Sequence, residues 1–187
     1  MKRLLDLALA AVGLVALSPL MAVIAIVIYC SSPGRIVIAQ ERVGRNEKIF
    51  KCFKFRTMTL DALQVGTHEA LESWITPVGK KLRNLKLDEL PQLYNVIRGD
   101  MSLVGPRPCL PTQDDVISAR RQQGVFSIRP GITGLAQVTG VDMSTPVTLA
   151  EVDRIYLETQ SLRGDLKIIV HTIFRIGGGT MVPPEGE

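Results

Sequence analysis

The chain has 187 residues, 46% of them hydrophobic and 21% charged, and this length fits one domain with enough apolar residues left for a core after a membrane segment is subtracted. A formal net charge of +4 suits a phosphate-rich partner or an anionic lipid surface, whereas nucleic acid is not expected because only 5% of residues are aromatic and they are not interleaved with the basic ones. Three well-separated cysteines and two histidines indicate neither a disulfide framework nor a zinc site.

The first predicted element is a membrane helix. Residues 7–29 are all apolar or small apart from Ser18, which is long enough to cross a hydrocarbon core of roughly 30 Å. A cleaved signal peptide is not expected, because the apolar run is long and no clear cleavage site follows it. We therefore predict a membrane helix over residues 1–30 and a cytoplasmic catalytic domain with a flexible C-terminal tail over residues 31–187.

Ser18 and Pro19 interrupt this apolar run near its middle. Proline removes one backbone donor and clashes with the carbonyl four residues before it, so we expect a kink there, with Ser18 bonding a freed carbonyl. Basic residues flank both ends of the run: Lys2, Arg3, Arg35 and Arg42. If positive charge marks the cytoplasmic side, both ends favour that side, which predicts a re-entrant helix hairpin. A single kinked transmembrane helix explains the residue pattern equally well.

A β-hairpin is predicted next. Residues 36–40 are predicted to form a short strand, residues 48–56 alternate charged with apolar side chains, and residues 44–47 supply the turn. The alternation places Lys54 and Arg56 on one face of the second strand. That face is either solvated or part of an anion site.

Two helices are expected after residues 60–73, which give no firm signal beyond a surface helix or loop. Thr76 followed by Pro77 is typical of a helix start. A second helix is predicted from Asp88, since aspartate is a favoured N-cap and Glu89 in the first turn complements the helix dipole. Capping alone is therefore a sufficient structural explanation for this pair of carboxylates.

The C-terminal half is predicted to contain two rigid loops and a helix. In both loops, proline and glycine hold an arginine: Gly105-Pro106-Arg107-Pro108 and Arg129-Pro130-Gly131-Ile132-Thr133-Gly134. Asp165 is predicted to cap a helix with one apolar face, which lies in the membrane interface or packs on the core.

The carboxylate pair also has a functional interpretation. Arginines in stiff loops are suited to bidentate phosphate contacts, and two adjacent carboxylates can share a hard cation such as Mg²⁺. A helix N-terminus would keep Asp88 ionised, and hence nucleophilic, while favouring an incoming phosphate. Phosphoryl chemistry beside a membrane is therefore our first hypothesis.

Six motifs stand in order along nearly the whole chain: Gln40-x-Arg42-x-Gly44, Lys54-Phe55-Arg56-Thr57-Met58, Leu87-Asp88-Glu89-Leu90-Pro91-Gln92, Gly99-Asp100-Met101-Ser102, Gly105-Pro106-Arg107-Pro108, and Arg129-Pro130-Gly131-Ile132-Thr133-Gly134-Leu135-Ala136-Gln137. In this order they closely resemble the motifs of the bacterial monotopic phosphoglycosyl transferases. The length of the chain resembles the small form of that family, which consists of the catalytic domain alone.

The resemblance implies transfer of a sugar 1-phosphate from a UDP-sugar to a polyprenyl phosphate, usually undecaprenyl phosphate, with release of UMP. It implies a ping-pong reaction in which Asp88 forms a covalent phosphosugar intermediate and Glu89 is associated with Mg²⁺. The enzyme would sit in the bacterial inner membrane, facing the cytoplasm, on a re-entrant helix broken at Ser18 and Pro19. The expected fold is α+β and mainly helical, with this hairpin, a short β-hairpin and interfacial amphipathic helices.

Further substrate contacts are weaker predictions. Arg107 is expected to contact nucleotide or phosphate, and Lys54, Arg56 and Arg129 are candidates for the diphosphate or the lipid phosphate. Asp153 resembles a family acidic position near the carboxylate pair, or is a surface helix residue.

Several alternatives stay open at this point. Trp74 and the Leu85-Lys86 pair depart from the family pattern, so the sugar is not defined. A non-catalytic membrane adaptor that recruits anionic lipids or partners predicts that Asp88→Asn is silent. A nucleotide-sugar hydrolase predicts UMP release without a lipid acceptor. Membrane lipids are expected partners, and whether the protein forms a homo-oligomer is open.

Overall fold

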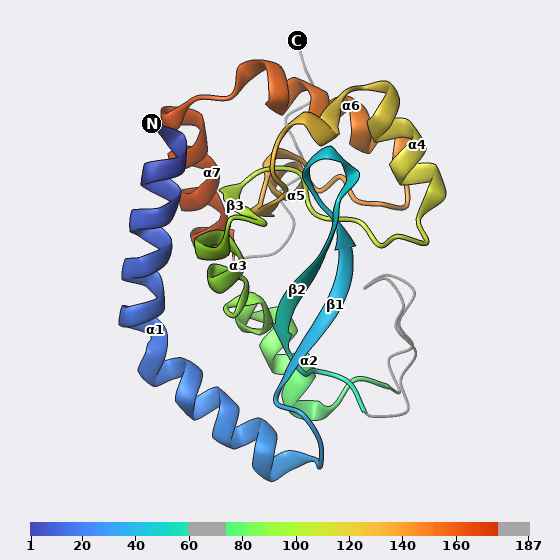
Figure 1. Ribbon diagram of the computed structural model, residues 1–187. Helices are drawn as coiled ribbons and strands as arrows, with labels where there is room; N and C mark the ends of the chain where they lie inside the picture. The colour runs from blue at the N-terminus through green and yellow to red at the C-terminus, as the bar shows by residue number, and fades with distance from the viewer. Residues whose placement is uncertain (60–73, 176–187) are drawn as a thin grey trace. The chain divides into compact units, whose positions relative to one another are not determined.

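The computed structural model describes residues 1–59 and 74–175, which are mainly helical (Figure 1). The helices are α1 (Lys2–Ser31), α2 (Pro77–Asn84), α3 (Gln92–Arg98), α4 (Asp114–Gln122), α5 (Leu135–Thr139), α6 (Pro146–Thr159) and α7 (Leu162–Arg175). The strands are β1 (Val37–Val43), β2 (Ile49–Phe55), β3 (Ser102–Val104) and β4 (Gly131–Thr133). The described residues also include the 3₁₀ turns η1 (Arg45–Glu47), η3 (Leu87–Glu89) and η4 (Val125–Ser127). The predicted mainly helical α+β class is confirmed, whereas the predictions for residues 60–73 and for the tail lie outside the described residues.

The chain divides into two compact units. The first unit contains Met1–Glu41 and Lys51–Gly99, and the second contains Arg42–Phe50 and Asp100–Glu187. Helix α1 therefore packs as part of the first unit, together with α2 and α3. The boundary after residue 30, which separates membrane from cytoplasm, stays a prediction.

Helix α1 continues through Pro19 and is long and apolar enough to cross a membrane. Its proline lacks the N–H that would bond the carbonyl of Val15, four residues earlier. The Ser18 hydroxyl donates to that same carbonyl at 2.8 Å, as the sequence predicts. Figure 1 shows α1 bent along its length, which is the expected effect of a proline inside a helix.

Both ends of α1 contact the first unit. Near the N-terminus, Nη2 of Arg3 donates to the Val96 carbonyl in the last turn of α3 at 2.6 Å. The C-terminal half contributes to a buried apolar cluster of Ile24, Ile28, Phe55 and Leu82. The remaining surface of α1 is apolar and open, with large exposed side chains along its length: Leu4, Val12, Val15, Val23, Ile26 and Tyr29.

The structure confirms the predicted hairpin, formed by β1 and β2, and the predicted start of α2. The strands pair as one two-stranded sheet, and the turn between them includes Asn46 and Glu47 in the left-handed region. Helix α2 begins after Thr76, whose Oγ1 accepts a hydrogen bond from the Gly79 amide at 2.9 Å. Gly79 packs so closely against the backbone of Thr57 that an added Cβ would lie 2.0 Å from the Thr57 carbonyl oxygen.

The prediction of a helix beginning at Asp88 is wrong. Asp88 lies inside the 3₁₀ turn η3, and α3 begins only at Gln92, after Pro91. Lys86 precedes the turn in the left-handed region at φ 54°, which reverses the chain after α2. Because Asp88 caps no helix, a helix dipole cannot be what keeps it ionised.

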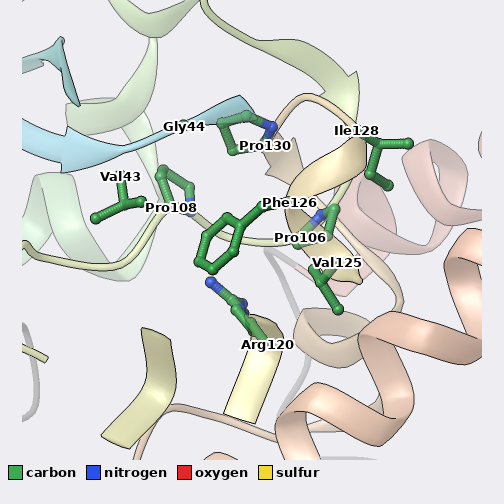
Figure 2. Close-up of a pocket in the computed structure, with 9 residues that line it drawn as sticks. All are labelled: Val43, Gly44, Pro106, Pro108, Arg120, Val125, Phe126, Ile128 and Pro130. Atoms are coloured by element: carbon green, nitrogen blue, oxygen red, sulfur yellow. The ribbon is translucent and has the colours of Figure 1, made fainter. Parts of the chain in front are cut away.

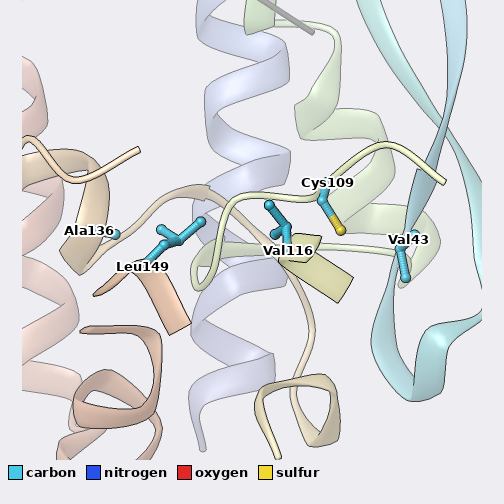
Figure 3. Close-up of a cluster of buried hydrophobic side chains, with 5 residues drawn as sticks. All are labelled: Val43, Cys109, Val116, Ala136 and Leu149. Carbon is cyan, nitrogen blue, oxygen red and sulfur yellow. The ribbon is translucent and has the colours of Figure 1, made fainter. Parts of the chain in front are cut away.

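The second unit contains a small parallel sheet that the sequence did not predict. Strands β3 and β4 pair in parallel, with Ser102 opposite Gly131 and Val104 opposite Thr133. Three residues are too few for a detectable alternation, and β4 lies within residues 129–134, which were predicted to be a loop. Around them lie buried side chains in one cluster shown in Figure 3: Val43, Cys109, Val116, Ala136 and Leu149.

Helix α7 begins earlier than predicted. Ser161 caps it, because the Ser161 Oγ accepts from the Gly164 amide at 3.1 Å. Asp165, the predicted cap, is instead buried and accepts a hydrogen bond from the Tyr156 hydroxyl at 2.8 Å. The helix packs on the core through Ile168, yet an apolar row stays exposed: Leu166, Val170, Ile173 and Phe174.

Candidate active site

The two carboxylates of η3 are mostly withdrawn from solvent. Asp88 is 8% exposed and Glu89 is 9% exposed. Leu87 and Leu90 on either side pack against the apolar cluster that includes the end of α1. Two adjacent carboxylates at this depth require cationic neighbours, because an uncompensated buried charge is strongly destabilising.

Lys54 supplies one of these cations. Its Nζ lies 3.7 Å from Oε1 of Glu89, and its side chain is only 12% exposed. The solvated-face interpretation of this strand is therefore wrong for Lys54, whose charge is directed at the carboxylate pair. The buried side chain of Asn95 fixes the strand beside it, since its amide accepts from the Phe53 amide at 3.0 Å and donates to the Lys51 carbonyl at 2.7 Å.

Arg83 supplies a second cation, and the sequence reasoning missed it. Its Nε donates to Oγ1 of Thr57 at 2.9 Å, which holds the end of α2 against the chain after β2. Burial lowers the pKa of Arg83, and the nearby negative charge of Asp88 opposes that shift. A basic residue in the last turn of a helix directly before an acidic pair is the signal that could have found it.

Arg56 is also buried, but its guanidinium is directed elsewhere. Nη1 donates to the Pro33 carbonyl at 2.6 Å, and Nη2 donates to the carbonyl and the hydroxyl of Ser32, each at 2.7 Å. These contacts fix the segment that follows α1. The structure thus brings Lys54, Asp88 and Glu89 together with Arg83, while Arg56 contacts the segment that follows α1.

The remaining predicted site residues lie in the second unit. Arg107 and Arg129 are partly buried, and the segments that carry them are joined through the backbone. The Gly105 amide donates to the Thr133 carbonyl, and the Gly131 amide donates to the Pro106 carbonyl, both at 2.9 Å. The two arginine-bearing segments therefore form one rigid element.

Asp153 is not a surface residue. It is 2% exposed, and its Oδ2 accepts from Nε of Arg120 at 2.9 Å and lies 2.7 Å from Nη2 of the same side chain. Burial raises the pKa of Asp153, while the Arg120 guanidinium opposes the shift. A carboxylate so enclosed is not placed to touch a substrate directly.

The candidate donors for a cation are the two carboxylates of η3. Within residues 1–59 and 74–175, no cluster of three or more His, Cys, Asp or Glu side chains has a metal-binding arrangement. Mg²⁺ commonly binds through one or two protein carboxylates together with substrate phosphates and water. Asp88 and Glu89 fit that donor set.

Comparison with known proteins identifies the family. The model of the family described as bacterial sugar transferase matches residues 1–178. The exopolysaccharide production protein ExoY of Sinorhizobium fredii is 38% identical, with 92% of this chain and 83% of that protein aligned. The UDP-glucose:undecaprenyl-phosphate glucose-1-phosphate transferase of Caulobacter vibrioides is 40% identical, with 92% of this chain and 68% of that protein aligned.

A third relative differs in the sugar that its name contains. The UDP-N-acetylgalactosamine-undecaprenyl-phosphate N-acetylgalactosaminephosphotransferase of Aeromonas hydrophila is 37% identical over 92% of this chain, which spans 42% of that longer protein. The resemblance drawn from the six motifs is thereby confirmed. The chain belongs to the bacterial sugar transferase family and is a phosphoglycosyl transferase enzyme.

Proposed function

We propose that this enzyme transfers a sugar 1-phosphate from a UDP-sugar to polyprenyl phosphate by a ping-pong mechanism, with Asp88 as the nucleophile. The observation that carries the proposal is the enclosed Asp88–Glu89 pair, with Lys54 beside Glu89 and Arg83 near Asp88. Cations around a carboxylate pair keep it ionised and attract the diphosphate of the donor.

In the first half-reaction, a carboxylate oxygen of Asp88 attacks the sugar-bearing phosphorus of the UDP-sugar. The bond from that phosphorus to the bridging oxygen breaks, and UMP leaves with the electron pair. The total charge is unchanged, since the carboxylate and donor carry three negative charges and so do the phosphosugar ester and UMP. Lys54 and Arg83 stabilise the negative charge that builds on the phosphoryl oxygens.

In the second half-reaction, an oxygen of the polyprenyl phosphate attacks the same phosphorus. The acyl phosphate bond breaks, Asp88 regains its carboxylate, and the polyprenyl diphosphate-sugar leaves. No proton is consumed or released in either half, so the site needs no general base. This explains why the described part of the site contains no histidine.

Glu89, with Asp88, would hold Mg²⁺ against the diphosphate. When bound, the cation neutralises phosphate charge and favours departure of UMP. Lys54 then has a second role, because it holds the Glu89 carboxylate in place at 3.7 Å.

We further propose that α1 is re-entrant and that both its ends lie on the cytoplasmic face of the inner membrane. Support comes from the two ends of α1, which contact the same unit through Arg3 at one end and through Ile24 and Ile28 at the other. A straight span would place its ends roughly 30 Å apart, on opposite faces. The exposed apolar surfaces of α1 and α7 would be covered by lipid.

The test is UMP release by the purified full-length enzyme with Mg²⁺, polyprenyl phosphate and a panel that includes UDP-glucose and UDP-N-acetylgalactosamine. We expect release with at least one donor, dependent on the lipid acceptor for continued turnover, and abolished by Asp88→Asn. Undiminished turnover without the acceptor would instead identify a nucleotide-sugar hydrolase.

A further inference from the structure

The arginine-bearing loop of the second unit is held from inside the protein by a buried guanidinium. Arg120, on α4, is 1% exposed, and its Nη1 donates to the carbonyl of Arg107 at 2.7 Å. Its other nitrogens are directed at the Asp153 carboxylate on α6. Figure 2 shows Arg120 beside the ring of Phe126, among the side chains that line a small cavity under Pro106 and Pro108.

The same segment is held at a second point by the next turn of α6. The Tyr156 hydroxyl lies 3.1 Å from the Val104 carbonyl and 2.8 Å from Oδ1 of Asp165, and it accepts from Nε2 of Gln160 at 3.1 Å. Tyr156 and Asp153 are three residues apart and so lie on one face of α6. This face therefore contacts the Val104 end of the segment directly, through Tyr156, and reaches the Arg107 end through Asp153 and Arg120.

The two prolines restrict the backbone conformation of the loop around Arg107. Pro106 and Pro108 have a fixed φ, and a residue before proline is restricted to extended conformations. Within that restricted range the tilt of the peptide plane between Arg107 and Pro108 can still vary, and the carbonyl of this plane is the group that Arg120 holds. The tilt of that plane sets the direction in which the Arg107 side chain leaves the loop.

Stability alone does not explain this arrangement. Replacing a buried ion pair by apolar residues of similar volume is often neutral or stabilising. A planar guanidinium can, however, reach a carboxylate and a carbonyl at fixed angles, which an apolar pair cannot do. Through its contact to the Arg107 carbonyl, the ion pair can fix the geometry of the loop.

We infer that Arg120 and Asp153 are positioning residues for Arg107: their ion pair orients the loop so that Arg107 meets the phosphate or nucleotide of the donor. The inference rests on the proposed function and on the prediction from the sequence that Arg107 binds the nucleotide or phosphate of the UDP-sugar. Asp153 thus acts through Arg120 and the loop, and not by touching the substrate.

A double-mutant cycle on the full-length enzyme tests this inference. Arg120→Lys keeps the positive charge but loses the planar guanidinium, which contacts the carboxylate and the carbonyl through different nitrogens. Asp153→Asn keeps the side-chain shape but loses the negative charge. We expect each to raise the KM for the UDP-sugar about tenfold, with a smaller effect on kcat. In the Arg107→Ala background the same changes should have no further effect on KM, because the positioned group is gone.

Arg154→Lys is the matched control. Arg154 is the next residue on α6, and it also contacts a carboxylate, Glu158 at 2.6 Å, and a carbonyl, that of Gln123 at 3.1 Å. Its contacts are exposed and do not involve the loop, so the KM should stay within twofold of the wild-type value. A second variant, Arg120→Met with Asp153→Leu, removes the pair without leaving an unpaired charge and should fold with a raised KM.

Two results overturn the inference. In one, Arg120→Lys multiplies the KM by the same factor with and without Arg107, which is the behaviour of a general structural residue. In the other, the Arg120→Met, Asp153→Leu enzyme has a normal KM. A failure of the proposed function can be told apart from a failure of this inference, because the wild-type enzyme would then release no UMP from any donor. The inference would be overturned together with the proposed function.

Discussion

Lys54 and Glu89 form an ion pair that is almost closed to solvent. The Nζ and Oε1 atoms are 3.7 Å apart, and the two side chains are 12% and 11% exposed. The pair joins the second strand of the hairpin to the turn that carries the proposed nucleophile. It therefore couples the position of the strand to the chemistry of the carboxylates.

Replacing Lys54 should impair both turnover and stability. Lys54→Met takes a positive charge away from the mostly buried Glu89 carboxylate, which costs about 3 kcal/mol of folding free energy, and it removes a cation that stabilises the phosphoryl oxygens. We expect kcat for UMP release to fall about 100-fold, with partial recovery in Lys54→Arg. Lys51→Met, at an exposed position of the same strand, is the control and should be unchanged. A fully active Lys54→Met enzyme would remove Lys54 from the site.

Arg83 should determine how the reaction depends on acidity. Its positive charge near Asp88 favours the ionised carboxylate, so its removal makes that carboxylate easier to protonate. We expect Arg83→Met to shift the acid limb of the kcat profile to higher pH and to lower the plateau. Lys80→Met, at an exposed position of α2, should leave the profile unchanged. An unshifted limb in Arg83→Met would show that Arg83 does not act on Asp88.

Pro19 should determine the path of α1 through the membrane. The native Cys30 is exposed at the C-terminal end of α1, while Cys52 and Cys109 are buried. Labelling with an impermeant thiol reagent therefore reports from which side of the membrane the C-terminal end of α1 is accessible in the wild-type protein. In a Lys2→Cys, Cys30→Ser protein it reports the accessibility of the N-terminal end. In inner-membrane vesicles of defined orientation, we expect both to be labelled from the cytoplasmic side only.

Pro19→Ala restores the missing backbone donor and should straighten the helix. We expect part of the Lys2→Cys population to become accessible from the opposite side, and activity to fall in proportion. Ser18→Ala removes only the hydrogen bond to Val15 and should have a smaller effect. Labelling of the two ends of wild-type α1 from opposite sides would contradict the re-entrant arrangement.

Removal of Mg²⁺ tests the role of Glu89. A chelator should abolish UMP release, and added Mg²⁺ should restore it. We expect Glu89→Gln to raise the Mg²⁺ concentration for half-maximal activity at least about tenfold. Glu41→Gln, at an exposed glutamate of β1, is the control. The same Mg²⁺ dependence in Glu89→Gln and wild type would show that Glu89 does not hold the cation.

Periodicity and turn chemistry predicted the larger elements of this fold. The apolar run, the alternating strand and the Thr76-Pro77 start are local signals, and the structure confirms the elements that they predicted. The parallel pairing of β3 with β4 depends on residues that are almost thirty positions apart, and three-residue strands have no period to detect. The helix predicted from Asp88 begins only at Gln92, because Lys86 adopts a left-handed conformation and η3 follows it, and the helical spacing of apolar residues does not predict either feature.

The candidate site, like the fold, was predicted from the sequence only in part. Motif resemblance named Asp88, Glu89 and Lys54 as candidates, but it gave no means to tell a substrate cation from a structural one. Arg56 and Asp153 were predicted to bind substrate, yet the first contacts the segment after α1 and the second is enclosed with Arg120. Arg83 and Arg120 were missed, because an isolated arginine carries no sequence signal for the group that it faces.

The central claim is that Asp88 carries the phosphosugar between the two substrates. The most direct test is mass spectrometry of the full-length enzyme, quenched in acid after incubation with its UDP-sugar and Mg²⁺ but without polyprenyl phosphate. We predict an added mass of one sugar phosphate on the peptide that contains Asp88, released when polyprenyl phosphate is added and absent in Asp88→Asn. No adduct on that peptide, in an enzyme that forms the lipid-linked product at its normal rate, would contradict the account.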